Sequence, residues 1–115
     1  MYNKLEKVVR VNLKDGMPTV EAAILKMKNA IATQRGQGGK AVLFIHGYGS
    51  SGVGGGIKIA VRKWLSENGQ GIVLTYVGGE QWLGRKREIL GLCKSLERFE
   101  REITNNEGIT VVILK

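Results

Sequence analysis

Residues 41–56 read AVLFIHGYGSSGVGGG, an apolar run followed at once by a glycine-rich segment. Five consecutive apolar residues, Ala41 to Ile45, are typical of a central strand that is covered on both faces. The glycines that follow let the backbone approach a ligand closely or adopt positive φ. A helix is expected next, from Ile57 to Glu67, because apolar residues recur along one side of it. The residues on that side are Ile57, Val61, Trp64 and Leu65.

The residues before this stretch predict one strand and one helix. Apolar and polar residues alternate between Val9 and Leu13, which is the period of a half-buried strand, and Asp15-Gly16 marks its end. Thr19 is the expected N-cap of a helix that ends near Gly36. The apolar face of that helix is expected to hold Val20, Ile24, Met27 and Ile31.

The residues after it continue the alternation of strands and helices. A buried strand is expected over Ile72 to Val77, and apolar residues at every third or fourth position predict a surface helix from Arg85 to Ile103. A last apolar strand, Ile109 to Leu114, is expected at or near the centre of the sheet. The order β-α-β-α-β-α-β predicts an α/β fold, a two-layer sandwich of about four strands in a mixed or mostly parallel sheet with helices packed on it.

Length and composition narrow the class of protein. No apolar run approaches the roughly 18 residues of a membrane-spanning helix, and the N-terminus lacks the apolar block of a signal peptide, which predicts a cytoplasmic protein. The single cysteine, Cys93, cannot form an internal disulfide and is expected to be a small buried hydrophobe. No metal or other cofactor is expected, since Asp15 is the only aspartate and His46, the only histidine, has no companion ligand at suitable spacing.

The distribution of charge favours a polyanionic partner. Lys and Arg number 18 against 10 Asp and Glu, a net charge of +8, and no acidic residue lies between Glu21 and Glu67. The glycine-rich turn falls within this acid-free stretch, where free backbone N–H groups and the positive end of a helix form an anion site. Lys58 and Arg62, spaced i and i+4, are expected on one exposed face of the helix, where they extend the site along a chain of phosphates.

Three enzyme motifs match parts of the turn. Gly47 to Gly52 fits the dinucleotide fingerprint G-x-G-x-x-G, but Glu80, the acidic residue after the next strand, lies about 30 residues on rather than about 20. A Walker loop is excluded because no Gly-Lys-Ser/Thr follows. The chemistry of α/β-hydrolases is excluded because the chain has no G-x-S-x-G and no second histidine.

A further resemblance covers nearly the whole chain. The segments Thr19 to Ala23, His46-Gly47-Tyr48-Gly49 and Gly108 to Val112, in this order of elements, resemble the small MutS-related (Smr) domain family. That family has an α/β fold similar to the C-terminal domain of bacterial translation initiation factor three, and its members bind DNA or RNA, some cleaving it with no known cofactor requirement. The resemblance implies that residues 1–115 form one Smr-like domain, in which residues 84–104 are an added helix.

The first strand departs from the family pattern. Smr domains commonly carry L-D-x-H there, whose Asp and His are associated with cleavage, whereas this chain has Val11-Asn12-Leu13-Lys14. Asn12 cannot act as a base, and Lys14 is a phosphate ligand before it is an acid or base. The resemblance therefore implies nucleic-acid binding with weak or absent endonuclease activity, and His46 is the one catalytic candidate.

The predicted nucleic-acid-binding residues come from the turn, the helix after it and the end of the first strand. They are His46, Gly47, Tyr48, Gly49, Gly52, Lys58, Arg62 and Lys14. DNA, RNA, branched DNA and the ribosome all stay open as partners. Two alternative functions also stay open: a small nucleotide-binding domain that uses the same turn for one pyrophosphate, and a protein-interaction module that docks its partner through the helix from Arg85 to Ile103.

Overall fold

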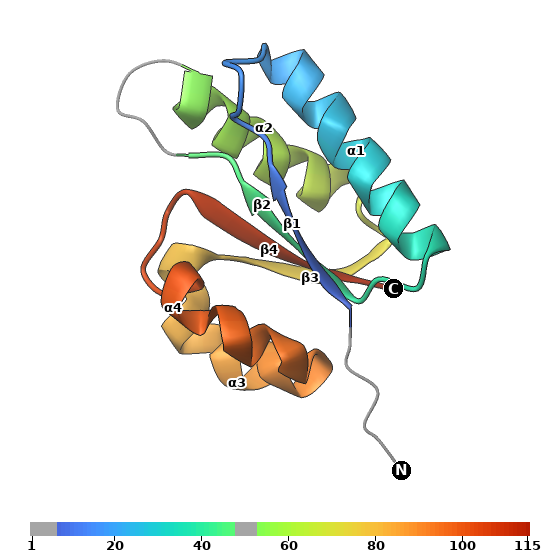
Figure 1. Ribbon diagram of the computed structural model, residues 1–115, viewed down its shortest axis with the longest axis vertical. Helices are drawn as coiled ribbons and strands as arrows, with labels where there is room; N and C mark the ends of the chain where they lie inside the picture. Colours follow the sequence, from blue (N-terminus) through green and yellow to red (C-terminus); the bar gives the residue numbers. More distant parts are fainter. Residues whose placement is uncertain (1–6, 48–52) are drawn as a thin grey trace.

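The structure is a computed structural model that describes residues 7–47 and 53–115 (Figure 1). Its elements follow in the order β1 (Val8–Asn12), α1 (Val20–Gly36), β2 (Ala41–Ile45), α2 (Val53–Asn68), β3 (Val73–Gly78), the 3₁₀ turn η1 (Gly79–Gln81), α3 (Trp82–Leu92), the 3₁₀ segment η2 (Lys94–Phe99), α4 (Glu100–Ile103) and β4 (Ile109–Leu114). Among the described residues, no helix has the length and hydropathy of a membrane-spanning segment.

The strands form one mixed sheet in the order β1-β2-β4-β3. β1 pairs with β2 in parallel, with Val11 opposite Phe44, and β4 runs antiparallel to both of its neighbours, β2 and β3. The predicted α/β class and mixed sheet are confirmed, and so is the central place of the last strand. β2 is apolar along its length, and β4 is apolar except at Thr110, as is typical of strands that are covered on both faces.

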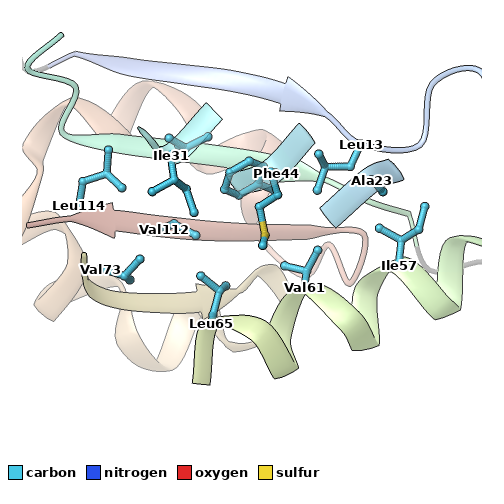
Figure 2. Close-up of a cluster of buried hydrophobic side chains, with 12 residues drawn as sticks. Leu13, Ala23, Ile31, Phe44, Ile57, Val61, Leu65, Val73, Val112 and Leu114 are labelled. Atoms are coloured by element: carbon cyan, nitrogen blue, oxygen red, sulfur yellow. The ribbon is translucent and has the colours of Figure 1, made fainter. Parts of the chain in front are cut away.

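Helices α1 and α2 cover one face of the sheet. Since successive side chains of a strand point to opposite faces, Phe44 of β2 faces these helices and Leu43 faces away. Figure 2 shows this first core, where Phe44 and Val112 from the sheet meet Ile31 from α1 and Val61 from α2. The predicted apolar faces of both helices therefore pack on the same side of the sheet.

The starts of these two helices differ in how well the sequence predicts them. Thr19 caps α1 as expected, and its Oγ1 accepts a hydrogen bond of 3.0 Å from a backbone N–H of the first turn. The predicted start of α2 at Ile57 is wrong, because α2 begins at Val53 and includes three glycines, each of which costs a helix about 1 kcal/mol. Gly56 serves the packing of the two helices, since a Cβ there would lie 3.3 Å from Cγ2 of Val20 in α1.

The opposite face of the sheet is covered by α3, η2 and α4 (Figure 1), so the sandwich has three layers and not the predicted two. Trp82, Ile89, Leu96 and Ile103 are fully buried in this second core. Trp82 is thus a core residue, and its Nε1 donates a hydrogen bond of 2.9 Å to Oε2 of Glu100. Residues 84–104, which the resemblance implies to be an added helix, therefore contribute most of the layer that covers this face of the sheet.

The predicted single surface helix from Arg85 to Ile103 is wrong. The chain leaves the helical conformation at Cys93, which is buried as expected and has extended backbone angles, φ −149° and ψ 93°. A continuous helix of that length would measure about 28 Å, whereas the six-residue strand β4 beneath it spans about 20 Å. Because the chain folds back at Cys93, Ile89 and Leu96 reach the same face of the sheet.

The second core predicts a large difference between two apolar residues of α3. Ile89→Ala is expected to lower the free energy of unfolding by about 2–4 kcal/mol, because it leaves a cavity at a fully buried site. Leu83→Ala is the matched control, since Leu83 is 60% exposed, and its effect is expected to stay within about 0.5 kcal/mol. Urea unfolding of both variants measures the difference, and equal losses would contradict the second core.

Candidate functional site

Three strand ends meet at one edge of the sheet (Figure 1). β1 and β2 finish there at Asn12 and Ile45, and β4 begins there at Ile109. The carbonyl of Gly108 accepts hydrogen bonds from the backbone N–H groups of both residues that follow β2, at 2.9 and 3.1 Å. The beginning of the glycine-rich segment is therefore tied to the loop that precedes β4.

The end of β1 is shaped by the side chain of Asn12. Its Oδ1 accepts hydrogen bonds from the backbone N–H groups of Lys14, at 2.9 Å, and Asp15, at 3.0 Å. Its backbone carbonyl also accepts a hydrogen bond of 2.7 Å from Nζ of Lys26. These contacts define the turn that presents Lys14 at the surface.

A polar groove of about 560 Å³ opens at this edge. Lys14 and Gly47, both predicted site residues, line it, together with residues of α4 and the loop before β4, among them Arg101 and Asn105. The contribution of this loop to the groove was not predicted from the sequence. Its composition, Asn105-Asn106-Glu107-Gly108, indicates a turn, and only the fold brings that turn beside the end of β1.

Two cationic side chains of the groove have no ion-pair partner among the described residues. Lys14 and Arg101 are exposed, and neither forms an ion pair with any residue that the structure describes. The acidic residues of the groove are both engaged, since Glu102 lies 2.7 Å from Nη2 of Arg10 and Glu107 lies 3.4 Å from Nζ of Lys58. The groove therefore presents positive charge to an anion.

Arg62 lies next to the groove in a different environment from the one predicted. Its guanidinium binds both carboxylate oxygens of Glu80, at 2.5 and 3.0 Å, and lies so close to Gly78 that a Cβ there would overlap it. Its Nε also donates to Oγ1 of Thr110, at 3.1 Å. The expectation of an exposed helix face is wrong here, because this face of α2 packs against the ends of β3 and β4.

Lys58 shares that face of α2, as the i, i+4 spacing predicts, and is half-buried like Arg62. Its Nζ lies between two carboxylates, 3.4 Å from Glu107 and 4.0 Å from Glu80. The hydrogen bonds from Arg62 hold the pKa of the Glu80 carboxyl below its usual range, so that group is ionised at neutral pH. Two cations and two carboxylates thus form a balanced cluster.

His46, the catalytic candidate, is fully buried and both of its ring nitrogens are hydrogen-bonded. Nδ1 lies 2.8 Å from the carbonyl oxygen of Gly47, which can only accept, so the proton is on Nδ1. Nε2 then accepts from the hydroxyl of Thr110, at 2.8 Å, and that oxygen accepts in turn from Arg62. Burial lowers the pKa of His46 to about 4, which leaves the imidazole neutral at pH 7.

Three other predicted site residues, Tyr48, Gly49 and Gly52, lie outside the described residues. Within the described part of the chain, no group of three or more His, Cys, Asp or Glu side chains could hold a metal ion. The arrangement that the structure does bring together is a cationic groove, Lys14 with Gly47 and Arg101, beside the balanced cluster around Arg62.

Comparisons with known proteins agree with this architecture. The model of the Smr domain family matches residues 12–86, which is more than half of the chain. Among solved structures, the chain is similar to the Smr domain of MutS2 from Thermus thermophilus, with 21% sequence identity and a TM-score of 0.58, over 95% of this chain and 98% of that one. That likeness concerns the fold. Comparison with the curated proteins gave no match.

The buried environment of His46 predicts an acidic titration. The imidazole is expected to gain its proton near pH 4 instead of near 6.5, because burial disfavours the charged form. The unfolded chain binds the proton first, so the contribution of His46 to the free energy of unfolding should fall by about 3 kcal/mol as the pH drops from 6.5 to 4. As His46 is the only histidine, one imidazole signal in an NMR titration measures its pKa. A midpoint near 6.5 would contradict the buried geometry.

The contacts of Arg62 predict a structural role. Arg62→Ala is expected to lower the free energy of unfolding by about 1–3 kcal/mol, because Glu80 and Thr110 both lose a donor. Lys63→Ala removes the same charge from the neighbouring exposed position and should change stability by less than about 0.5 kcal/mol. Thermal and urea unfolding compare the two variants. An unchanged melting temperature for Arg62→Ala would show that the ion pair adds nothing to stability.

Proposed function

Since the chain belongs to the Smr domain family, we propose that it binds nucleic acid in the groove at the carboxyl ends of β1 and β2. Smr domains generally bind nucleic acids. The observation that supports this groove most directly is its pair of cations without ion-pair partners among the described residues, Lys14 from the turn after β1 and Arg101 from α4. Phosphate is the anion that a nucleic acid offers to such a pair.

The proposed contacts divide into ligands and supporting groups. Lys14, Arg101 and the backbone of Gly47 contact phosphate, with Tyr48, Gly49 and Gly52 as predicted further contacts. Lys58 joins them when a phosphate replaces the exposed carboxylate of Glu107 beside it. His46 and Arg62 are supporting groups. Arg62 donates to Thr110, Thr110 donates to His46, and His46 donates to the carbonyl of Gly47, which holds that peptide in place.

Binding is the proposed activity, with cleavage weak or absent. In the positions that the family associates with cleavage, the side chain of Asn12 is occupied by hydrogen bonds within its own turn and Lys14 stands where the family has histidine. His46 has no free ring nitrogen with which to move a proton. None of these groups supplies the acid–base pair that hydrolysis of a phosphodiester requires.

Of the two alternatives, docking of a protein partner through residues 85–103 loses its basis. The apolar side chains that would form the docking face, Ile89, Leu96 and Ile103, are fully buried in the second core. Binding of a mononucleotide uses the same groove and is distinguished by competition. A mononucleotide offers fewer phosphate groups than a long strand, so it should displace that strand only at much higher concentration.

The proposal predicts that removing either groove cation, one in the turn after β1 and one in α4, lowers the affinity for nucleic acid by a similar factor. Lys14→Ala and Arg101→Ala should each weaken binding to any nucleic-acid sequence about three- to tenfold and reduce the slope of log affinity against log salt by about 1. Lys28→Ala removes the same charge from an exposed position of α1 outside the groove and should have little effect. Fluorescence anisotropy at several salt concentrations measures all three. Equal affinities for the Lys14 and Lys28 variants would remove the proposed site.

A further inference from the structure

We infer that the groove accepts one unpaired nucleotide, whose phosphate lies between Lys14 and Arg101 and whose base is recognised by the side chain of Asn105. The inference rests on the proposed function and adds the class of nucleic acid that binds, single-stranded segments in preference to continuous duplex. Arg101 and Asn105 both lie beyond residue 86, where the match to the family model ends.

Asn105 has an unusual backbone conformation. Its φ is +58°, in the left-handed region that non-glycine residues rarely occupy. Its backbone N–H donates to the carbonyl of Gly79 at 3.0 Å, which fixes the residue against η1. The side-chain amide, by contrast, has no hydrogen-bond partner among the described residues, and Asn105 is exposed where it lines the groove. The backbone of Asn105 is thus fixed, and its side-chain amide is available to a ligand.

The loop around Asn105 is held rigid on both sides. The side chain of Asn106 donates to the carbonyl of Glu102 at 3.1 Å and accepts from the backbone N–H of Gly108 at 2.8 Å. The hydroxyl of Thr104 donates to the carbonyl of Glu100 at 2.7 Å. Because these bonds order the loop before any ligand arrives, binding through Asn105 costs little conformational entropy.

The chemistry of the three side chains matches the parts of a nucleotide. A carboxamide offers a donor and an acceptor side by side, which is the pattern that base edges complement, as in the pairing of asparagine with adenine. Lys14 and Arg101 supply charge for the adjoining phosphate. No side chain of the described groove offers a second amide free of internal hydrogen bonds, since Asn106 uses both ends of its own.

The size of the groove favours an unpaired nucleotide. About 560 Å³ lies within the range of sites that hold one small molecule. A base inside a duplex is stacked on its neighbours and hydrogen-bonded to its partner strand, so it enters such a site only after unpairing and unstacking. A single-stranded segment presents its bases without that cost, and its affinity for the groove should therefore be higher.

The experiment compares a labelled single strand with a hairpin duplex of the same length, by fluorescence anisotropy at one salt concentration. The wild-type chain is expected to bind an adenine-containing single strand at least fivefold more tightly than the duplex. Asn105→Gly should lower the affinity for the single strand three- to tenfold and leave duplex binding and the salt slope unchanged, because it removes no charge. Glycine accepts positive φ, so this variant keeps the backbone of the loop.

Asn29→Ala is the control, since it removes an exposed amide from α1 outside the groove. Equal binding of single strand and duplex, or an Asn105→Gly variant that binds the single strand as the wild type does, would overturn the inference. If Lys14→Ala still weakens binding in that case, the proposed function stands without it. Absence of binding to every nucleic acid would overturn both.

Discussion

Four segments of the chain meet in one series of hydrogen bonds near the carboxyl end of β2. The carboxylate of Glu80 holds Arg62, Arg62 donates to Thr110, and Thr110 donates to His46, whose other ring nitrogen donates to the carbonyl of Gly47. The series joins η1, α2, β4 and the end of β2. Because Arg62 is half-buried and Thr110 and His46 are buried, removal of one of these three side chains leaves a buried partner unpaired. The position of Gly47, and so one side of the groove, depends on this series.

Charge acts at this edge through individual ion pairs more than through the net charge of +8. Arg62 and Lys58 contribute two positive charges to the region, and Glu80 and Glu107 balance them at short range. What reaches a ligand is the charge that remains without a carboxylate beside it. A chain of the same composition with a different arrangement of carboxylates would carry its unpaired positive charge elsewhere on the surface.

Much of the fold is predictable because runs of apolar residues and a helix cap indicate its elements locally. The apolar run of β2, the apolar run of β4 and the cap at Thr19 each follow from neighbouring residues alone. The break at Cys93 does not, because the repeat of apolar residues continues through it and only the length of the sheet requires the chain to turn. The start of α2 at Val53 does not follow from local patterns either, because three glycines in its first turn have low helix propensity.

For the site, the sequence by itself determined that a glycine-rich segment follows a central strand and that Lys58 and Arg62 share a helix face. Its resemblance to the Smr family implied that Lys14 aligns with a histidine of the family pattern. Only the tertiary structure decided which of these cations stays free. Arg62 meets Glu80 across 18 positions of sequence and Lys58 meets Glu107 across 49. Asn105 reaches the groove only because β4 pairs with β2. Contacts over such separations depend on strand order and packing, and no local pattern of residues encodes them.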